Sequence, residues 1–292
     1  MRFDPETNRV LVRQSWLGDA LMCPQRAKYA LSMPSMRRGS DATAIGTGLH
    51  SVIEQVLRGD VLELEHMKSN ARLFVAKELE KDVKRTGLSD DVDEMNQCVD
   101  SMCQAWWDNI RPSVAMGGLI EYRFVAPLGV HAFNGNEIWL EGTMDYVAPD
   151  GTIWDWKTSS RTYYAKEKQS QSHQATCYIT AGRTLDLIPN TDEPSVFRFG
   201  VMVRQSTPKA QIVSVSRGPE QVQWFARQVK SVVDSAMRSW GDSDWPMNDQ
   251  HNLCSSKWCD YWNICKGAHW TEASLSLPSQ TVNIAVTTDP TV

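Results

Sequence analysis

Two aspartates and a lysine near the middle of the chain have the residue types that metal-assisted chemistry needs. Asp155 and Lys157 stand two positions apart in a segment with the alternating pattern of a β-strand. Side chains of a strand alternate between its faces, so both are expected on one side, with Trp154 and Trp156 packed on the other. A tight hairpin would place Asp145, on the preceding strand, beside them. Two carboxylates and an ammonium would then converge at one end of a small sheet.

This combination suits the hydrolysis of a phosphodiester bond. The reaction needs a hydroxide at neutral pH and stabilisation of charge on the phosphate. Carboxylate oxygens hold Mg²⁺ or Mn²⁺, which supplies both. A lysine beside the cation can orient or deprotonate the water and offset developing negative charge. Because an isolated D-x-K also occurs as a solvated surface pair, its chemistry depends on the segments around it.

Helical periodicity dominates the first third of the chain. In one of these segments Leu49, Ile53 and Leu57 repeat every four positions on one face. Pro24 would kink the first helix, and a basic, glycine-containing loop at 32–42 follows it. The predicted helices cover 13–31, 43–57, 61–87 and 92–110.

The pattern then changes to strands. Pro149, Asp150 and Gly151 form a turn signal, so the segments on either side of them, 137–157 in all, are predicted as a hairpin. The predicted strands are 120–125, 137–147, 152–157, 196–204 and 210–216, with helices at 172–187 and 220–240. These elements predict a mixed α/β core with an α-helical insertion towards its N-terminus.

Composition favours a soluble, cytoplasmic-type protein. The chain has 292 residues and a net charge of −5, from 30 basic and 35 acidic residues. It contains no secretory leader and no apolar run near the roughly 18 residues that span a bilayer, so no membrane partner is expected. The acidic balance makes no global case for nucleic-acid binding. What matters is where the positive charge lies, and an acidic metal pocket lowers the total.

Seven cysteines occur at uneven spacing. Without a leader, a disulfide framework is not expected. Three of them, Cys254, Cys259 and Cys265, crowd together near the C-terminus, and such thiolate density indicates metal ligation. Cys23 is the candidate fourth ligand, and free buried cysteines are the alternative. The remaining three have no ligand spacing and are expected in the core: Cys98, Cys103 and Cys177.

Four short motifs follow one another at plausible spacing. They are GTGLH at 46–50, EGTMD at 141–145, DWKT at 155–158 and QATCY at 174–178. In this order they resemble the PD-(D/E)xK nuclease superfamily, specifically its RecB-like exonuclease branch, from about residue 15 to 266. The resemblance implies a restriction-endonuclease-like fold, in which a mixed central sheet is flanked by helices.

The same resemblance implies a single nuclease domain over residues 1–271. Its parts would be a helical portion at about 43–111, a catalytic α/β core at about 119–240 and a cysteine segment at 254–266. A flexible tail at 272–292 would follow.

A metal site is implied residue by residue. His50, Asp145 and Asp155 would bind Mg²⁺ or Mn²⁺, with the backbone carbonyl of Trp156 as a further ligand. Glu121, on the first strand of the core, could contribute through a water molecule.

Three more side chains complete the catalytic set that begins with the two aspartates. Lys157 would act on the attacking water. Gln174 and Tyr178 would position the lysine or a DNA phosphate, and they lie one helical turn apart on a shared face. An ordinary helix-face pair is the alternative for these two.

The cysteines resemble those of a subset of RecB-like nucleases that includes the AddB nuclease domain and CRISPR-adaptation nucleases. That subset holds a [4Fe–4S] cluster, which implies Cys23, Cys254, Cys259 and Cys265 as ligands. The C-x4-C-x5-C run here has a longer first gap than the family's C-x2-C-x5-C. Zinc is the competing metal for four thiolates. Either metal centre would cross-link the N-terminal helix to the C-terminal segment.

Basic residues near the expected site are candidates for DNA contacts. Arg161, Lys166 and Lys168 lie between the catalytic strand and the Gln174 helix, and Arg37 with Arg38 lies in the basic loop. The expected substrate is DNA with linear or single-stranded ends.

The resemblance implies a metal-dependent DNA exonuclease in phage or prokaryotic recombination or repair, located in the cytoplasm (the host's, if viral). No Walker A motif is present, so no helicase motor is expected. Oligomers and recombination or annealing partners occur among such nucleases. Two other functions stay open: a non-catalytic DNA-binding or assembly module on the same fold, and an iron–sulfur redox or sensing protein.

Overall fold

The computed structural model describes residues 1–81, 83–84 and 91–269. The chain divides into two compact units, Met1–Met247 and Asn248–Val292. In the described part of the second unit, a 3-10 turn (Trp262–Ile264) precedes the short helix α9 (Lys266–His269). One nuclease domain over residues 1–271 stays a prediction, and the predicted tail at 272–292 lies outside the described residues.

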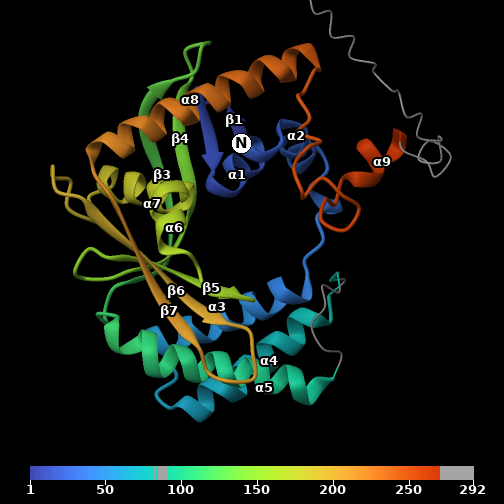
Figure 1. Ribbon diagram of the computed structural model, residues 1–292. Helices are drawn as coiled ribbons and strands as arrows, with labels where there is room; N and C mark the ends of the chain where they lie inside the picture. Colours follow the sequence, from blue (N-terminus) through green and yellow to red (C-terminus); the bar gives the residue numbers. More distant parts are fainter. Residues whose placement is uncertain (82, 85–90, 270–292) are drawn as a thin grey trace, which may run out of the picture. The chain divides into compact units, whose positions relative to one another are not determined.

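A mixed seven-stranded sheet forms the centre of the first unit (Figure 1). Its order is β1-β2-β4-β5-β6-β7, and β3 also pairs with β4. The pairs β2/β4 and β5/β6 are parallel, and the other pairs are antiparallel. The strands are β1 (Arg2–Asp4), β2 (Arg9–Arg13), β3 (Leu119–His131), β4 (Glu137–Val147), β5 (Ile153–Ser159), β6 (Ser195–Val203) and β7 (Ala210–Arg217).

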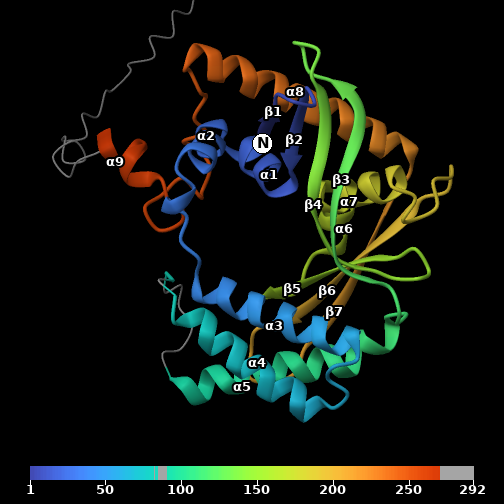
Figure 2. The ribbon, with the colours of Figure 1, turned by 180° about the vertical axis from the view of Figure 1, so that it is seen from behind.

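Helices cover both faces of this sheet (Figure 2). One apolar cluster joins the sheet to α1, α7 and α8, and a second joins it to α3, α4 and α5. In the described part of the chain, no helix is long and apolar enough to cross a membrane. The helices are α1 (Gln14–Met22), α2 (Pro24–Ser32), α3 (Asp41–Arg58), α4 (Leu64–Leu79), α5 (Val92–Ala105), α6 (Ala165–Gln171), α7 (His173–Thr184) and α8 (Pro219–Asp242).

The observed architecture confirms the predicted fold class, a mixed α/β structure with a central mixed sheet flanked by helices. The predicted hairpin is present as β4 and β5. Its turn contains Gly151 at a φ of +80°, and the Thr152 amide donates to Asp150 Oδ1 at 2.9 Å. Trp154 and Trp156 are buried and stack with ring centroids 5.5 Å apart. The packing face of β5 was therefore predicted correctly.

Several features differ from expectation. The helix predicted at 61–87 is shorter, since α4 ends at Leu79, and residues 82 and 85–87 of that prediction lie outside the described residues. Helix α6 was not predicted. The helix predicted at 13–31 is two helices, because Cys23 is extended (φ −157°, ψ 105°) before Pro24, the first residue of α2. A residue before proline avoids the helical region, so the kink becomes a break. Strands β1 and β2 were not predicted. They are short. Strand β2 depends on pairing with β4, which is more than a hundred positions away in the sequence, and β1 pairs in turn with β2.

Helices α3 and α4 pack closely because Gly48 has no side chain. A Cβ atom there would lie 2.5 Å from Cγ2 and 2.9 Å from the backbone nitrogen of Val75 in α4. Neither atom belongs to the end of a long, flexible side chain, so the two helices would have to move apart.

We expect Gly48→Ala to lower the free energy of unfolding by about 1–3 kcal/mol, the usual cost of overpacking. Denaturant unfolding measures this change. Gly18→Ala in α1 is the matched control, since a Cβ atom at Gly18 meets nothing within 4 Å. The control should keep stability or raise it by up to about 1 kcal/mol, because alanine favours helix over glycine. Equal stability of both variants would contradict the close packing at Gly48.

Candidate active site

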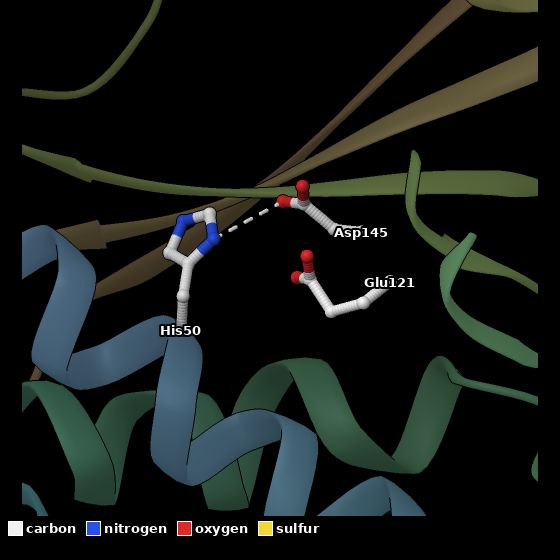
Figure 3. Close-up of side chains that lie close together, drawn as sticks. All are labelled: His50, Glu121 and Asp145. Carbon is white, nitrogen blue, oxygen red and sulfur yellow. Dashed lines mark ion pairs between the residues drawn. The ribbon is translucent and has the colours of Figure 1, made fainter. Parts of the chain in front are cut away.

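One open cleft beside the sheet collects His50, Asp145 and Lys157 from the predicted site residues. Its volume is about 590 Å³, and α3, β3, β4 and β5 all contribute to its lining. His50 enters from α3, Glu121 from β3 and Asp145 from β4 (Figure 3). Trp156 and Lys157 enter from β5. Three segments that are far apart in the sequence therefore meet in one place.

Helix α3 can present His50 because its start is fixed and it lies close to β5. Ser40 Oγ caps the helix by accepting a hydrogen bond from the Thr43 amide at 3.1 Å. A Cβ atom on Gly46 would lie only 3.3 Å from Oγ1 of Thr158 in β5. Gly46 and His50 share a helix face. The small residue thus lets the histidine approach the sheet.

The hydrogen bonds of His50 fix which ring nitrogen carries the proton. Nε2 lies 2.6 Å from the carbonyl oxygen of Trp156, which can only accept, so Nε2 is the donor. Nδ1 faces Oδ2 of Asp145 at 3.4 Å. Burial lowers the pKa of His50, so the ring is neutral at neutral pH and Nδ1 is an acceptor. Two acceptors facing each other are best satisfied by a cation between them.

Glu121 lies beside His50 and Asp145. It stands opposite Asp145 in the β3/β4 ladder, between the partners Ile120↔Tyr146 and Tyr122↔Met144. Its φ of +48° is unusual for a glutamate inside a strand, and such strain clusters at functional sites. The sequence predicted at most a water-mediated role, because nothing in the local pattern signals a positive φ.

The three side chains could hold a metal ion together. One ligand atom from each of His50, Glu121 and Asp145 lies within 4.8 Å of the others. Asp145 Oδ2 also accepts a hydrogen bond from the Trp156 amide at 2.8 Å, which orients the carboxylate. Carboxylate oxygens suit Mg²⁺ or Mn²⁺, and an imidazole nitrogen is a common ligand of divalent transition metals. The donor set therefore fits the predicted divalent cation.

Asp155 occupies a different position from the one expected of a ligand. Its carboxylate is almost fully buried, with Oδ1 accepting from Gln174 Nε2 at 2.7 Å. Lys157 Nζ lies 2.6 Å from Oδ2, as an ion pair rather than a well-aligned hydrogen bond. In this arrangement Asp155 anchors Lys157 and Gln174. Its predicted role as a metal ligand stays a prediction.

Gln174 and Tyr178 lie one turn apart on α7, on the side of Asp155. The Tyr178 ring packs edge-on against Phe124, with centroids 5.8 Å apart. Burial raises the pKa of the Tyr178 phenol, and the negative charge of Asp155 raises it further, so the phenol stays protonated. A neutral hydroxyl can donate a hydrogen bond and cannot serve as an anionic base.

Charge in the cleft is set by two carboxylates and one lysine. Burial raises the pKa of Asp145 well above its usual value, and Asp155 raises it further. Burial lowers the pKa of Lys157, but the charges of Asp155 and Asp145 outweigh this effect, and the net pKa is raised. Lys157 is therefore a cation at neutral pH. An ammonium in this position can stabilise negative charge but has no lone pair to accept a proton.

Arg204 is a further residue of the cleft that the sequence did not indicate. It follows β6, and its amide donates to the carbonyl of Ser159, at the end of β5, at 2.7 Å. Parallel pairing of β5 and β6 brings it here. Only knowledge of that pairing could have identified it.

The predicted DNA-contact residues differ in their surroundings. Arg37 Nη2 pairs with Asp19 Oδ2 at 2.8 Å. Lys168 Nζ lies over the Tyr163 ring, 4.4 Å from its centroid. The others have exposed side chains: Arg38, Arg161 and Lys166. Their DNA contacts stay predictions.

All seven cysteines are free thiols. Burial raises the pKa of Cys103 and of Cys177 to about 12, as expected for core residues. Cys23 lies at the break between α1 and α2. The other three predicted cluster ligands belong to the second unit and are partly exposed: Cys254, Cys259 and Cys265. The four-cysteine ligand set stays a prediction from the sequence.

We expect Glu121→Gln to weaken Mn²⁺ binding by about 10–100-fold, the usual range for losing a group that supports a metal site. Isothermal titration calorimetry measures the affinity directly. Glu6→Gln removes the same charge from an exposed turn and should leave the affinity unchanged. If both variants bind Mn²⁺ like the unmodified protein, Glu121 takes no part in the metal site.

The comparisons with known proteins agree with this geometry. The family model of the PD-(D/E)XK nuclease superfamily matches residues 14–266. A solved structure from Eubacterium rectale, named as a candidate exonuclease, is similar in fold over 87% of this chain and 92% of that chain, at a TM-score of 0.51 and 15% identity. The structure of SSO0001 covers 93% of this chain and 90% of its own at a TM-score of 0.38 and 10% identity, too low to carry an argument. No curated protein matches. The family match spans most of the chain, which therefore belongs to the PD-(D/E)XK nuclease superfamily.

Proposed function

We propose that this protein is a Mg²⁺- or Mn²⁺-dependent exonuclease that hydrolyses phosphodiester bonds in DNA. One observation carries the proposal: His50, Glu121 and Asp145 form a hard-ligand cluster in the same cleft as the Lys157 ammonium. Membership of the nuclease superfamily supports hydrolysis of a nucleic acid. The fold shared with a candidate exonuclease agrees with action at chain ends.

His50, Asp145 and Glu121 would hold the metal, with the carbonyl of Trp156 beside them. The bound cation would supply a hydroxide at neutral pH and offset charge on the phosphate. The acidic side chains of the cleft would repel a phosphate, so a bound cation would also strengthen binding of the phosphate at the metal centre.

Lys157 would stabilise the charge that develops on the phosphate. Its ammonium is held by Asp155, so it needs little reorganisation during the reaction. Gln174 donates a hydrogen bond to the other carboxylate oxygen of Asp155 and thereby holds Asp155 in place. Tyr178 lies one turn further along α7 and packs against Phe124. Lys157 and Gln174 thus act as one unit through a shared carboxylate.

Linear and circular DNA distinguish an exonuclease from other functions. The protein should degrade linear DNA with Mg²⁺ or Mn²⁺, leave covalently closed circles intact and be inactive in EDTA. Lys157→Ala should lower the rate by about 10²–10³-fold, as expected for the loss of one charge-stabilising group. Lys209→Ala, in the exposed β6–β7 turn, removes the same charge away from the cleft and should retain full activity.

Two outcomes would contradict the proposal. Cleavage of circular DNA at the same rate would indicate an endonuclease. Binding of DNA without hydrolysis under any metal condition would favour the non-catalytic DNA-binding or assembly module. A role in phage or prokaryotic recombination or repair, with an annealing partner, is part of the proposal because free DNA ends arise in those processes.

The second part of the proposal is a [4Fe–4S] cluster with Cys23, Cys254, Cys259 and Cys265 as ligands. The C-terminal density of Cys254, Cys259 and Cys265, with Cys23 as the fourth residue, supports it. The role would be structural, so loss of the cluster should affect stability before it affects chemistry.

Cys259→Ala should lower the iron content and solubility of the purified protein, measured by elemental analysis and by absorbance of the brown cluster. Cys98→Ala changes a half-buried cysteine without ligand spacing and should keep full iron content. Zinc in place of iron would identify the competing metal. Full iron content in Cys259→Ala would remove this cysteine from the ligand set, whereas reversible changes of activity on oxidation would favour a sensing role.

A further inference from the structure

A second cavity lies on the same strand pair as the metal site. Its volume is about 590 Å³, and residues from the β2/α1 junction, β3, β4 and α7 line it. Two arginines, Arg13 and Arg123, stand in its wall together with the hydroxyl residues Ser15 and Thr143. None of these four belongs to the predicted catalytic or DNA-contact residues. In a chain with a net charge of −5, a cavity with two guanidinium groups needs its own explanation.

Strand geometry connects this cavity to the metal centre. Thr143 precedes Asp145 by two positions on β4, and Arg123 follows Glu121 by two on β3. Arg123 and Thr143 are direct partners in the antiparallel ladder. Two residues of a strand span about 7 Å. The cavity and the metal centre are therefore close enough for one nucleic-acid strand to occupy both.

Arg13 is oriented by a buried carboxylate. The parallel register of β2 and β4 pairs it with Glu141, and Arg13 Nε donates to Glu141 Oε1 at 2.8 Å. Its side chain is 68% exposed, and within the described residues its two terminal nitrogens donate to no protein atom. Arg2 pairs with the other oxygen of Glu141 at 3.2 Å. Glu141 is thus neutralised, and the free end of Arg13 remains to bind an anion.

Arg123 is less constrained. It is exposed, and it forms no hydrogen bond or ion pair with the described part of the protein. Arg123 follows the metal-site residue Glu121 by two positions on β3, and it is not paired to that carboxylate. An exposed, unpaired arginine beside a catalytic cleft is suited to a phosphate ligand.

The N-terminus of α1 and two aromatic side chains also suit the cavity to a nucleotide. No side chain caps α1, and its first turn contains no acidic residue, so the helix leaves its positive end open beside Ser15. Phe124 and Tyr178, in edge-to-face contact, form an apolar part of the lining. A basic wall with an apolar floor matches a nucleotide, which has a charged phosphate and an apolar sugar and base face.

We propose that Arg13 and Arg123 form a phosphate-binding subsite for the nucleic-acid strand, beside the bond that is cleaved at the metal centre. This inference rests on the proposed function. The phosphate is either an internal diester or the terminal phosphate of a strand, because both offer the same anionic oxygens.

The test separates binding from cleavage. Fluorescence anisotropy in EDTA follows the binding of a labelled single-stranded oligonucleotide over a range of salt concentrations. Arg123→Gln and Arg13→Gln should each raise Kd by about tenfold and reduce the slope of log K against log salt by about 0.7. Arg227→Gln on α8 removes an exposed arginine elsewhere and should leave the slope unchanged. Circular dichroism melting checks that each variant is folded.

Each outcome decides one point. Salt slopes of both cavity variants equal to that of Arg227→Gln would overturn the subsite, even if the protein degrades DNA. With Mn²⁺ present, the cavity variants should raise KM for DNA and change kcat little, which distinguishes them from Lys157→Ala. If the unmodified protein binds DNA but never cleaves it, the proposed function fails and the slope test still decides the subsite. A loss confined to oligonucleotides with a 5′- or 3′-phosphate identifies a terminal phosphate, and an equal loss with hydroxyl ends identifies an internal one.

Discussion

Two carboxylates placed close together away from water set the electrostatic constraint of this site. Asp155 is almost fully buried and Asp145 largely so, and burial together with the charge of Asp155 raises the pKa of Asp145. Lys157 compensates one negative charge. His50, whose pKa is lowered, does not compensate the second. The remaining charge, together with that of Glu121, is a reason for this fold to bind a divalent cation. The arrangement costs stability unless an ion is bound, as expected where function rather than stability determines the residues.

The same constraint explains why backbone strain and small residues gather around the site. An imidazole can reach the carboxylates only if α3 lies against β5, and Gly46 and Gly48 permit close packing on either side of that helix. Glu121 can reach them only with a positive φ. These features lower local stability but bring ligands from three segments within reach of one ion. The second apolar cluster, which joins α3, α4 and α5 to the sheet, offsets that loss by burying a large apolar surface.

What the sequence could predict follows from the range of the interactions involved. The β4–β5 hairpin and helix α3 were predictable, because alternation, a turn signal and helical periodicity are local patterns. The placement of Asp145 beside Lys157 followed from that hairpin. The position of Glu121 next to His50 and Asp145 was not predictable, since it depends on a positive φ within a strand. Nor were β1, β2 and Arg204, which depend on pairing between distant strands. The anchoring contacts of Asp155 required the position of α7 over the sheet, which no local pattern specifies.

Strand β4 links the two chemically distinct parts of the molecule. It pairs with β2, β3 and β5, and along its length it carries Glu141, Gly142, Thr143 and Asp145. A Cβ atom on Gly142 would lie 2.9 Å from the Phe124 ring, so the strand is packed tightly where it lines the arginine cavity. Shifting β4 by one residue against its neighbours would reverse which side chains face the cleft. It would also separate Arg13 from Glu141. One register therefore fixes both the acidic residues that attract a cation and the basic residues available to an anion, and their spacing cannot change independently.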